Sequence, residues 1–157
     1  MKKMKKHPVL ITLLALTALG QTTLAFAHDL TGSLGAASTA MDYYQVHCYN
    51  FGDGSGDTNR IYVAVRNNST TIPKLSIQVI RDDNTGTTLP ATATNTTDAA
   101  NGNATFSPTI IYKGGNGFFY LAVDKTAVGA VNYSLQYHCE ASDGGHTGTD
   151  IVQTINQ

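Results

Sequence analysis

The chain has 157 residues, two of them cysteine, and ten basic against eleven acidic side chains. A chain of this length suits one domain with a single core. Four of the bases lie within the first six residues, so the chain beyond residue 27 has six bases against eleven acids and a formal charge of −5. This excess of acid argues against nucleic acid and anionic lipid as partners, because both are bound by clustered lysine and arginine.

Residues 1–27 have the three parts of a secretory signal peptide. Four lysines form a positive start, and a nearly continuous apolar run follows from Pro8 to Leu19. Ala25 and Ala27 then supply the small residues that a signal peptidase requires. The apolar run is too short to cross a bilayer as a helix. We therefore predict cleavage after Ala27 and an exported chain, secreted or periplasmic, without a transmembrane segment. The alternative is an uncleaved anchor.

The remaining chain is predicted to be all-β. Residues 28–41 are rich in small residues, and we interpret them as a flexible N-terminal lead-in; the alternative is that pairing with a sheet edge holds them down. From Asp42 onward, stretches of valine, isoleucine, tyrosine and phenylalanine alternate with turn-forming clusters. We predict strands over residues 42–49, 60–66, 74–81, 87–92, 104–113, 117–124 and 131–139, a long exposed loop over 91–103, and a polar C-terminal tail over 140–157. The expected fold is an antiparallel, jelly-roll-like β-sandwich of about seven strands over residues 42–139.

Cys48 and Cys139 are predicted to form a disulfide, because an even pair of cysteines in an exported chain is ordinarily oxidised. The bond would close a loop of about 90 residues and contribute roughly 4 kcal/mol if unstrained. Alternation places Cys48 on the apolar face of its strand with Tyr44 and Val46, and it places Cys139 on the apolar face of the last strand with Tyr137. Both cysteines are therefore expected in the core.

Five segments follow one another in an order found in a known family. They are Asp-Tyr-Tyr-Gln-Val at 42–46, Arg-Ile-Tyr-Val-Ala-Val at 60–65, Leu-Ser-Ile-Gln-Val-Ile-Arg-Asp at 75–82, Gly-Phe-Phe-Tyr-Leu-Ala-Val at 117–123 and Val-Asn-Tyr-Ser-Leu at 131–135. This series resembles the bacterial pre-peptidase C-terminal domain, a jelly-roll-like β-sandwich appended to secreted proteases and other exported enzymes. The resemblance implies a non-catalytic module, sometimes calcium-bound, that aids binding, solubility or secretion. The chain departs from the family in showing no catalytic domain and in its cysteine pair, which leaves a stand-alone function open.

A glycine-rich loop at residues 52–59 is the first candidate site. Asp53, Ser55, Asp57 and Asn59 alternate there with small residues, so a curled loop would point several oxygens at one hard cation. Ca²⁺ takes about six to eight such oxygen ligands. The alternative is an acidic hairpin loop whose glycines serve only the turn.

The histidines are the second candidate. His28, His47, His138 and His146 follow the predicted signal peptide. His47 and His138 each directly precede a cysteine, so the disulfide is expected to bring them together on one surface. Two adjacent imidazoles suit Cu²⁺ or Zn²⁺. Cleavage after Ala27 would make His28 the first residue and offer an amine and an imidazole to the same metal, which resembles the copper histidine brace of exported copper proteins. The alternative is a set of exposed polar positions without a ligand.

Tyrosines outnumber phenylalanines, and some of them are expected to face outward. Tyr43 and Tyr49 share the outward face of their strand with His47, so they are the predicted ligand-contacting aromatics, with carbohydrate as one candidate ligand. The alternative is the ordinary tyrosine of a sandwich, whose hydroxyl reaches water.

Catalytic motifs are sparse. No Gly-x-Ser-x-Gly elbow is present, and the adjacent carboxylates of Asp82 and Asp83 lie in a predicted turn. We therefore predict a non-enzymatic binding module with calcium or copper as the candidate metal. Two alternatives stay open: a structural or adhesin-like subunit that assembles with a protein partner or with itself through a sheet edge, and copper-dependent oxidation through His28.

Overall fold

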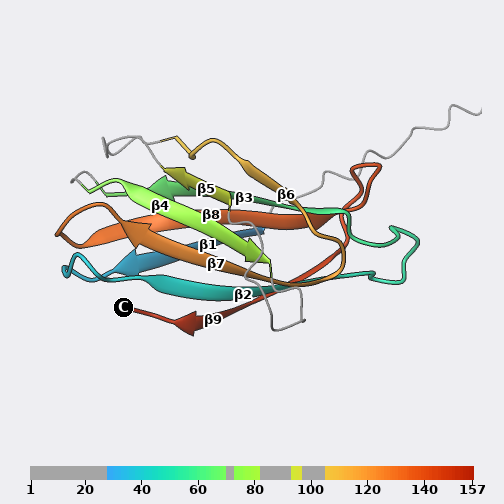
Figure 1. Cartoon of the computed structure of the whole chain (residues 1–157), viewed down its shortest axis with the longest axis horizontal. Coiled ribbons are helices and arrows are strands. Elements are labelled where there is room, and N and C mark those ends of the chain that lie inside the picture. The colour runs from blue at the N-terminus through green and yellow to red at the C-terminus, as the bar shows by residue number, and fades with distance from the viewer. Residues whose placement is uncertain (1–27, 70–72, 82–92, 97–104) are drawn as a thin grey trace, which may run out of the picture.

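The computed structural model describes residues 28–69, 73–81, 93–96 and 105–157, which form two antiparallel sheets packed face to face (Figure 1). Their strands are β1 (His28–Leu34), β2 (Asp42–Tyr49), β3 (Arg60–Asn67), β4 (Leu75–Arg81), β5 (Ala93–Thr96), β6 (Ile110–Lys113), β7 (Gly117–Lys125), β8 (Val131–Glu140) and β9 (Gly148–Ile155). The predicted antiparallel β-sandwich is confirmed, with nine strands in the described residues rather than about seven. These residues contain no helix that could span a membrane.

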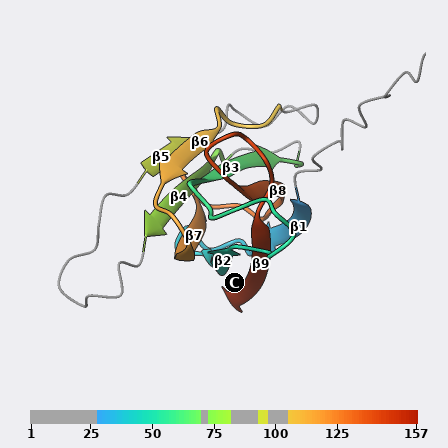
Figure 2. The same cartoon turned by 90° about the vertical axis from the view of Figure 1, so that its right-hand side faces the viewer.

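The two sheets are interleaved along the chain. The four-stranded sheet has the order β1-β8-β3-β6, and the five-stranded sheet has the order β5-β4-β7-β2-β9. Successive strands therefore often belong to opposite sheets, as the end-on view in Figure 2 shows. At one side of the sandwich, the amide of Gly35 donates to the carbonyl oxygen of Gln157 at 2.9 Å, which ties the end of β1 to the residues after β9.

The core lies between the sheets and follows the predicted alternation. On β2, Tyr44, Val46 and Cys48 are buried while their neighbours are half-exposed. On β8, Leu135, Tyr137 and Cys139 are buried, and Gln136 and His138 between them are half-exposed. Burial of these apolar side chains is the main force that holds the sheets together.

The disulfide between Cys48 and Cys139 is confirmed, and it crosses the core from one sheet to the other. Its Cα atoms are 5.8 Å apart, and neither cysteine is exposed to solvent. Because β2 belongs to the five-stranded sheet and β8 to the four-stranded sheet, the bond joins the two layers rather than two neighbouring strands.

A buried hydroxyl network closes the opposite end of the core. Tyr133 donates its hydroxyl hydrogen to the Asp42 carboxylate, and the hydroxyls of Tyr44 and Tyr133 are 2.5 Å apart. The second carboxylate oxygen of Asp42 accepts the amide of Gln157 at 2.9 Å. Burial, together with hydrogen bonds to Asp42 and Tyr44, raises the pKa of Tyr133 and keeps its phenol protonated. The fully buried carboxylate is thus satisfied by two other parts of the chain, β8 and the residues after β9.

Residues 28–34 differ from the prediction of a flexible lead-in, because they form β1. All seven residues of β1 pair with β8 from His28↔Tyr137 to Leu34↔Val131. Leu30 and Leu34 pack on the core, and the ring of Tyr133 lies so close over Gly32 that a Cβ there would be 2.3 Å from it. Gly32, one of the small residues that suggested flexibility, therefore serves a close approach of backbone and ring.

Three other segments also differ from the prediction. The polar tail over residues 140–157 contains β9, which pairs with β2. The strand predicted from residue 104 begins only at Ile110, after Pro108, which has no amide hydrogen for a ladder. The predicted loop over 91–103 contains the short β5, which pairs with β4. The strand predicted over 87–92 and the signal peptide over 1–27 lie outside the described residues.

Replacing both cysteines by alanine is expected to lower the free energy of unfolding by about 4 kcal/mol, because the bond closes 91 residues of sequence and restricts the unfolded chain. Urea unfolding of the double variant beside the oxidised protein measures the difference. An unchanged midpoint would contradict a stabilising inter-sheet bond.

Tyr133→Phe is expected to cost about 1–3 kcal/mol, because it removes the donor to the buried carboxylate of Asp42. Tyr44→Phe is the matched control and should cost about 1 kcal/mol or less, since Tyr133 keeps its bond to Asp42. Urea unfolding of the two variants measures the decrease in the free energy of unfolding. Equal decreases would contradict the larger contribution of the Tyr133 hydroxyl.

Candidate metal centre

The structure separates the two histidines that precede the cysteines. Cys48 and Cys139 point at each other across the core, so the residues before them point away from it on opposite sides. His47 lies on the outer face of the five-stranded sheet, where its ring is stacked against Phe118 at a centroid distance of 4.4 Å. His138 lies on the outer face of the four-stranded sheet. The predicted proximity of His47 and His138 is therefore wrong, because the disulfide crosses the sandwich instead of joining neighbours within a sheet.

A different set of side chains comes together at His138. One ligand atom from each of His138, Glu140 and His146 lies within 4.8 Å of the other two. His138 and Glu140 are two residues apart on β8, so both side chains stand on the same outer face. His146 comes from the loop between β8 and β9 and forms an isolated bridge with Glu140.

The loop that brings His146 back is held by main-chain hydrogen bonds. The Ala141 amide donates to the Gly145 carbonyl oxygen at 2.8 Å, and the Thr147 amide donates to that of Cys139 at 2.9 Å. Gly144 has a φ of 90°, a left-handed value that glycine adopts at little cost. A 2.6 Å hydrogen bond between the hydroxyls of Thr147 and Thr58 fixes the end of the loop. His146 is thus positioned by a tight, anchored turn.

Glu140 is the electrostatic centre of the cluster. Its Oε1 is 2.8 Å from Nε2 of His138, and its Oε2 accepts from Nη2 and Nε of Arg60 at 2.9 and 3.1 Å. Hydrogen bonding to Glu140 raises the pKa of Arg60. The carboxylate is therefore oriented by β3 on one side and faces the imidazoles on the other.

The imidazole rings form a parallel stack. His138 lies between Tyr62, at a centroid distance of 4.8 Å, and His146, at 4.6 Å. Burial lowers the pKa of His146, and the nearby charges of His138 and His28 lower it further, while Glu140 opposes them. His146 is consequently held in the neutral form, which is the form that ligates a metal.

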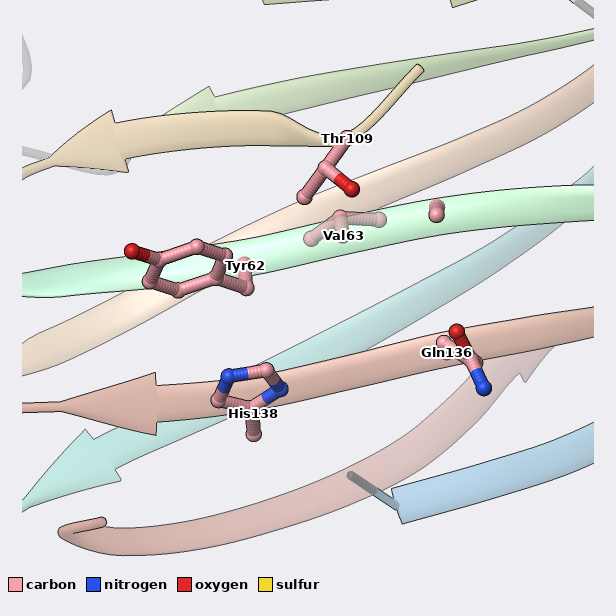
Figure 3. Close-up of a pocket in the computed structure, with 6 residues that line it drawn as sticks. Tyr62, Val63, Thr109, Gln136 and His138 are labelled. Carbon is pink, nitrogen blue, oxygen red and sulfur yellow. The ribbon is translucent and has the colours of Figure 1, made fainter. Parts of the chain in front are cut away.

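A small hollow lies beside His138 on the outer face of the four-stranded sheet (Figure 3). Its volume is about 90 Å³, and its lining includes Tyr62, Thr109 and Gln136. Nδ1 of His138 is buried and has no hydrogen-bond partner among the described residues. In Figure 3 one ring nitrogen of His138 points toward Gln136. Because an ionised carboxylate only accepts, Nε2 donates to Glu140 and Nδ1 is the ring nitrogen left without a partner.

His28 lies near the same end of β8. It is the first residue of β1 and pairs with Tyr137, with 5.6 Å between their ring centroids. Its charge acts on His146, so the two side chains are electrostatic neighbours. The structure thus brings His28, His138 and His146 toward one end of the sheet and leaves His47 on the other face.

Both acids of the glycine-rich loop between β2 and β3 accept hydrogen bonds from amide groups. Gly52, Gly54 and Gly56 have left-handed φ values of 79°, 96° and 83°. Oδ1 of Asp53 accepts the Ser55 amide at 2.9 Å.

Asp57 and Asn59 are engaged with neighbouring segments. Oδ1 of Asp57 accepts from Nδ2 of Asn116 at 2.8 Å and from Nδ2 of Asn50 at 3.2 Å. The main-chain amide of Asn59 donates to the carbonyl oxygen of Glu140 at 2.7 Å. Each acid of the loop has an oxygen that accepts from an amide, and calcium binding here stays a prediction.

Sequence reasoning singled out His138 and named His146 among the histidines without placing it in the site, and it missed Glu140 and Arg60. Glu140 stands at i+2 from His138 on the same strand, a spacing that alternation alone could have flagged. Arg60 and His146 reach the site from another strand and from a loop, so their positions depend on pairing and loop closure.

No protein-family model matches the chain, and neither a curated protein nor a solved structure matches it. The resemblance to the pre-peptidase C-terminal domain therefore stays a prediction, as does copper-dependent oxidation through His28.

The electrostatics of the centre can be tested by titrating the histidines. His138→Gln is expected to raise the pKa of His146, because it removes a neighbouring positive charge, whereas Glu140→Gln is expected to lower it, because it removes a neighbouring negative charge. Imidazole chemical shifts followed by NMR against pH give both values. Shifts of the same sign in the two variants would contradict the cluster.

Proposed function

We propose that this protein is an exported, non-enzymatic binding module that holds a divalent transition-metal ion at His138, Glu140 and His146. The observation that carries the proposal is the convergence of three ligand atoms within 4.8 Å. A disulfide in the core is compatible with an oxidising compartment outside the cytoplasm.

The chemistry of the donors favours copper or zinc. Two imidazole nitrogens and one carboxylate oxygen are a donor set that proteins use for Zn²⁺. Cu²⁺ binds such a set more tightly than other divalent ions of the first transition row. Ca²⁺ prefers oxygen ligands only, which this cluster does not supply.

Neighbouring groups prepare the site for a metal. When Oε1 of Glu140 turns away and Nε2 of His138 releases its hydrogen to solvent, both atoms become available to the ion, while Oε2 keeps its ion pair with Arg60. A ligand carboxylate held by a second hydrogen-bond partner is a common feature of metal sites. The three side chains thus need only a small rearrangement to surround an ion.

Isothermal titration of metal-free protein with Cu²⁺, and separately with Zn²⁺, tests the proposal. His138→Ala and His146→Ala are each expected to weaken binding at least about 100-fold, since loss of a ligand costs no less than loss of a group that orients one. Arg60→Ala is expected to weaken it about tenfold, because the carboxylate loses its support.

His47→Ala is the matched control, because this histidine lies on the opposite face and should leave the affinity unchanged. Equal affinities of the wild type, His138→Ala and His146→Ala would remove the site.

The second candidate is assembly through a sheet edge, which the exposure of β9 favours. β9 ends the five-stranded sheet and exposes Val152 and Ile155 at 60% and 39%. Edge strands with exposed apolar residues pair readily with another chain. Size-exclusion chromatography at several concentrations distinguishes the two functions: assembly that persists in chelator favours the edge, and a monomer throughout excludes self-assembly by this route.

A further inference from the structure

Aromatic side chains gather on the outer face of the five-stranded sheet, away from the metal centre. We call this set the aromatic face; it consists of Tyr43, His47, Tyr49, Phe51, Phe118 and Tyr120. His47 and Phe118 are partners in the β2–β7 ladder, so their side chains stand side by side. The aromatic face thus contains Tyr43 and Tyr49, which were predicted to point outward, together with Phe118 and Tyr120 of β7.

The rings form two stacked groups. In the first, the centroid distances are 6.2 Å from Phe51 to Tyr49, 5.0 Å from Tyr49 to His47 and 4.4 Å from His47 to Phe118. In the second, Tyr43 and Tyr120 are 5.6 Å apart. The end rings of the first group are well exposed, Phe51 at 63% and Phe118 at 42%. Mutual stacking holds the rings in place before any ligand arrives, which reduces the entropy cost of binding.

Uncharged hydrogen-bonding groups lie among and beside the rings. Nε2 of Gln45 donates to the hydroxyl of Tyr120 at 3.1 Å. Ser76 and Gln78 on β4 pair with Asp124 and Ala122 on β7 and extend the polar part of the same face. Such groups bond the hydroxyls of a sugar, while aromatic rings pack against its CH groups through their negative π faces.

The charge of the aromatic face argues against nucleic acid, whose bases also stack on aromatic rings. None of the outward-pointing residues in the described strands β2, β4, β7 and β9 is lysine or arginine, and Asp124 and Asp150 are acidic. Arg81 ends β4 beside the face, where its guanidinium donates to the carbonyl oxygens of Asn116 and Phe118. Nucleic acid and other polyanions require basic groups beside the rings. A face that presents aromatic rings, amides and carboxylates but no outward-pointing basic side chain fits a neutral ligand.

The shape of the face favours a polymer over a single sugar. Two cavities among the described residues lie away from the aromatic face. One is beside His138, and the other is between β1 and β9 around Gly32 and Gln153. The aromatic face follows β2 from Tyr43 to Tyr49, a length of about 20 Å at the rise of a β-strand. An open surface of this length accommodates several consecutive units of a linear chain.

We propose that the aromatic face binds a neutral, linear polysaccharide. The purified protein, kept in chelator so that the metal centre is empty, is mixed with microcrystalline cellulose, with chitin and with a soluble mixed-linkage β-glucan. Retention on at least one of these is expected, and it should persist in high salt because no ion pairs contribute.

The test variant is Phe51→Ala with Phe118→Ala, which removes the two most exposed rings of the face and should reduce retention at least about tenfold. The matched control is Ile111→Ala with Val128→Ala, which removes two side chains exposed at 53% and 70% away from the aromatic face. The control should bind as the wild type does, and unchanged melting temperatures show that both variants fold.

Three results would overturn the proposal. They are no retention on any of the three polysaccharides, equal retention by both double variants, and a concentration-dependent dimer without retention that Phe51→Ala with Phe118→Ala abolishes. The last result would assign the face to a contact between copies of the chain.

Discussion

The bond between Cys48 and Cys139 is the constraint on which the arrangement of both outer faces depends. It joins β2 of one sheet to β8 of the other with 5.8 Å between the Cα atoms, so it fixes which sides of these strands face inward. Successive side chains of a strand alternate between faces. The residues next to each cysteine are therefore directed outward, His47 to one surface and His138 to the other.

The two outer faces consequently have different chemistry. On the four-stranded sheet, Arg60, His138 and Glu140 form a compact charged cluster that the loop after β8 completes with His146. On the five-stranded sheet, stacked rings and amides replace the charged cluster. Because the core separates the faces, a ligand on one does not compete for space with a ligand on the other. Substitutions on one surface can therefore be made without changing the side chains of the other.

The far end of the core depends on a polar network rather than on a covalent bond. Asp42 is fully buried, and its carboxylate accepts from Tyr133 and from the main chain of Gln157. A buried carboxylate is stable only when its oxygens are satisfied. The network therefore holds the residues after β9 close to the start of β2, and β9 completes the five-stranded sheet beside β2.

The sequence by itself determined the all-β class of the fold, which faces of β2 and β8 point into the core, and the disulfide. These follow from local properties, since alternation reports the inward side of a strand whatever its partners are. The outward position of Tyr43 and Tyr49 was determined in the same way. Glu140 was assigned to the polar tail, and only the observed extent of β8 places it on the same face as His138.

Only the tertiary structure decided which sheet each strand joins, and this non-local choice placed His47 and His138 on opposite surfaces. It also decided that His146 folds back to Glu140, because loop closure is not encoded in strand periodicity. The pairing of residues 28–34 with β8 is also non-local, because main-chain groups make this ladder whatever the side chains are. Gly32 is small because the ring of Tyr133 lies over it. Local pattern sets orientation, whereas long-range pairing sets proximity, and a binding site requires both.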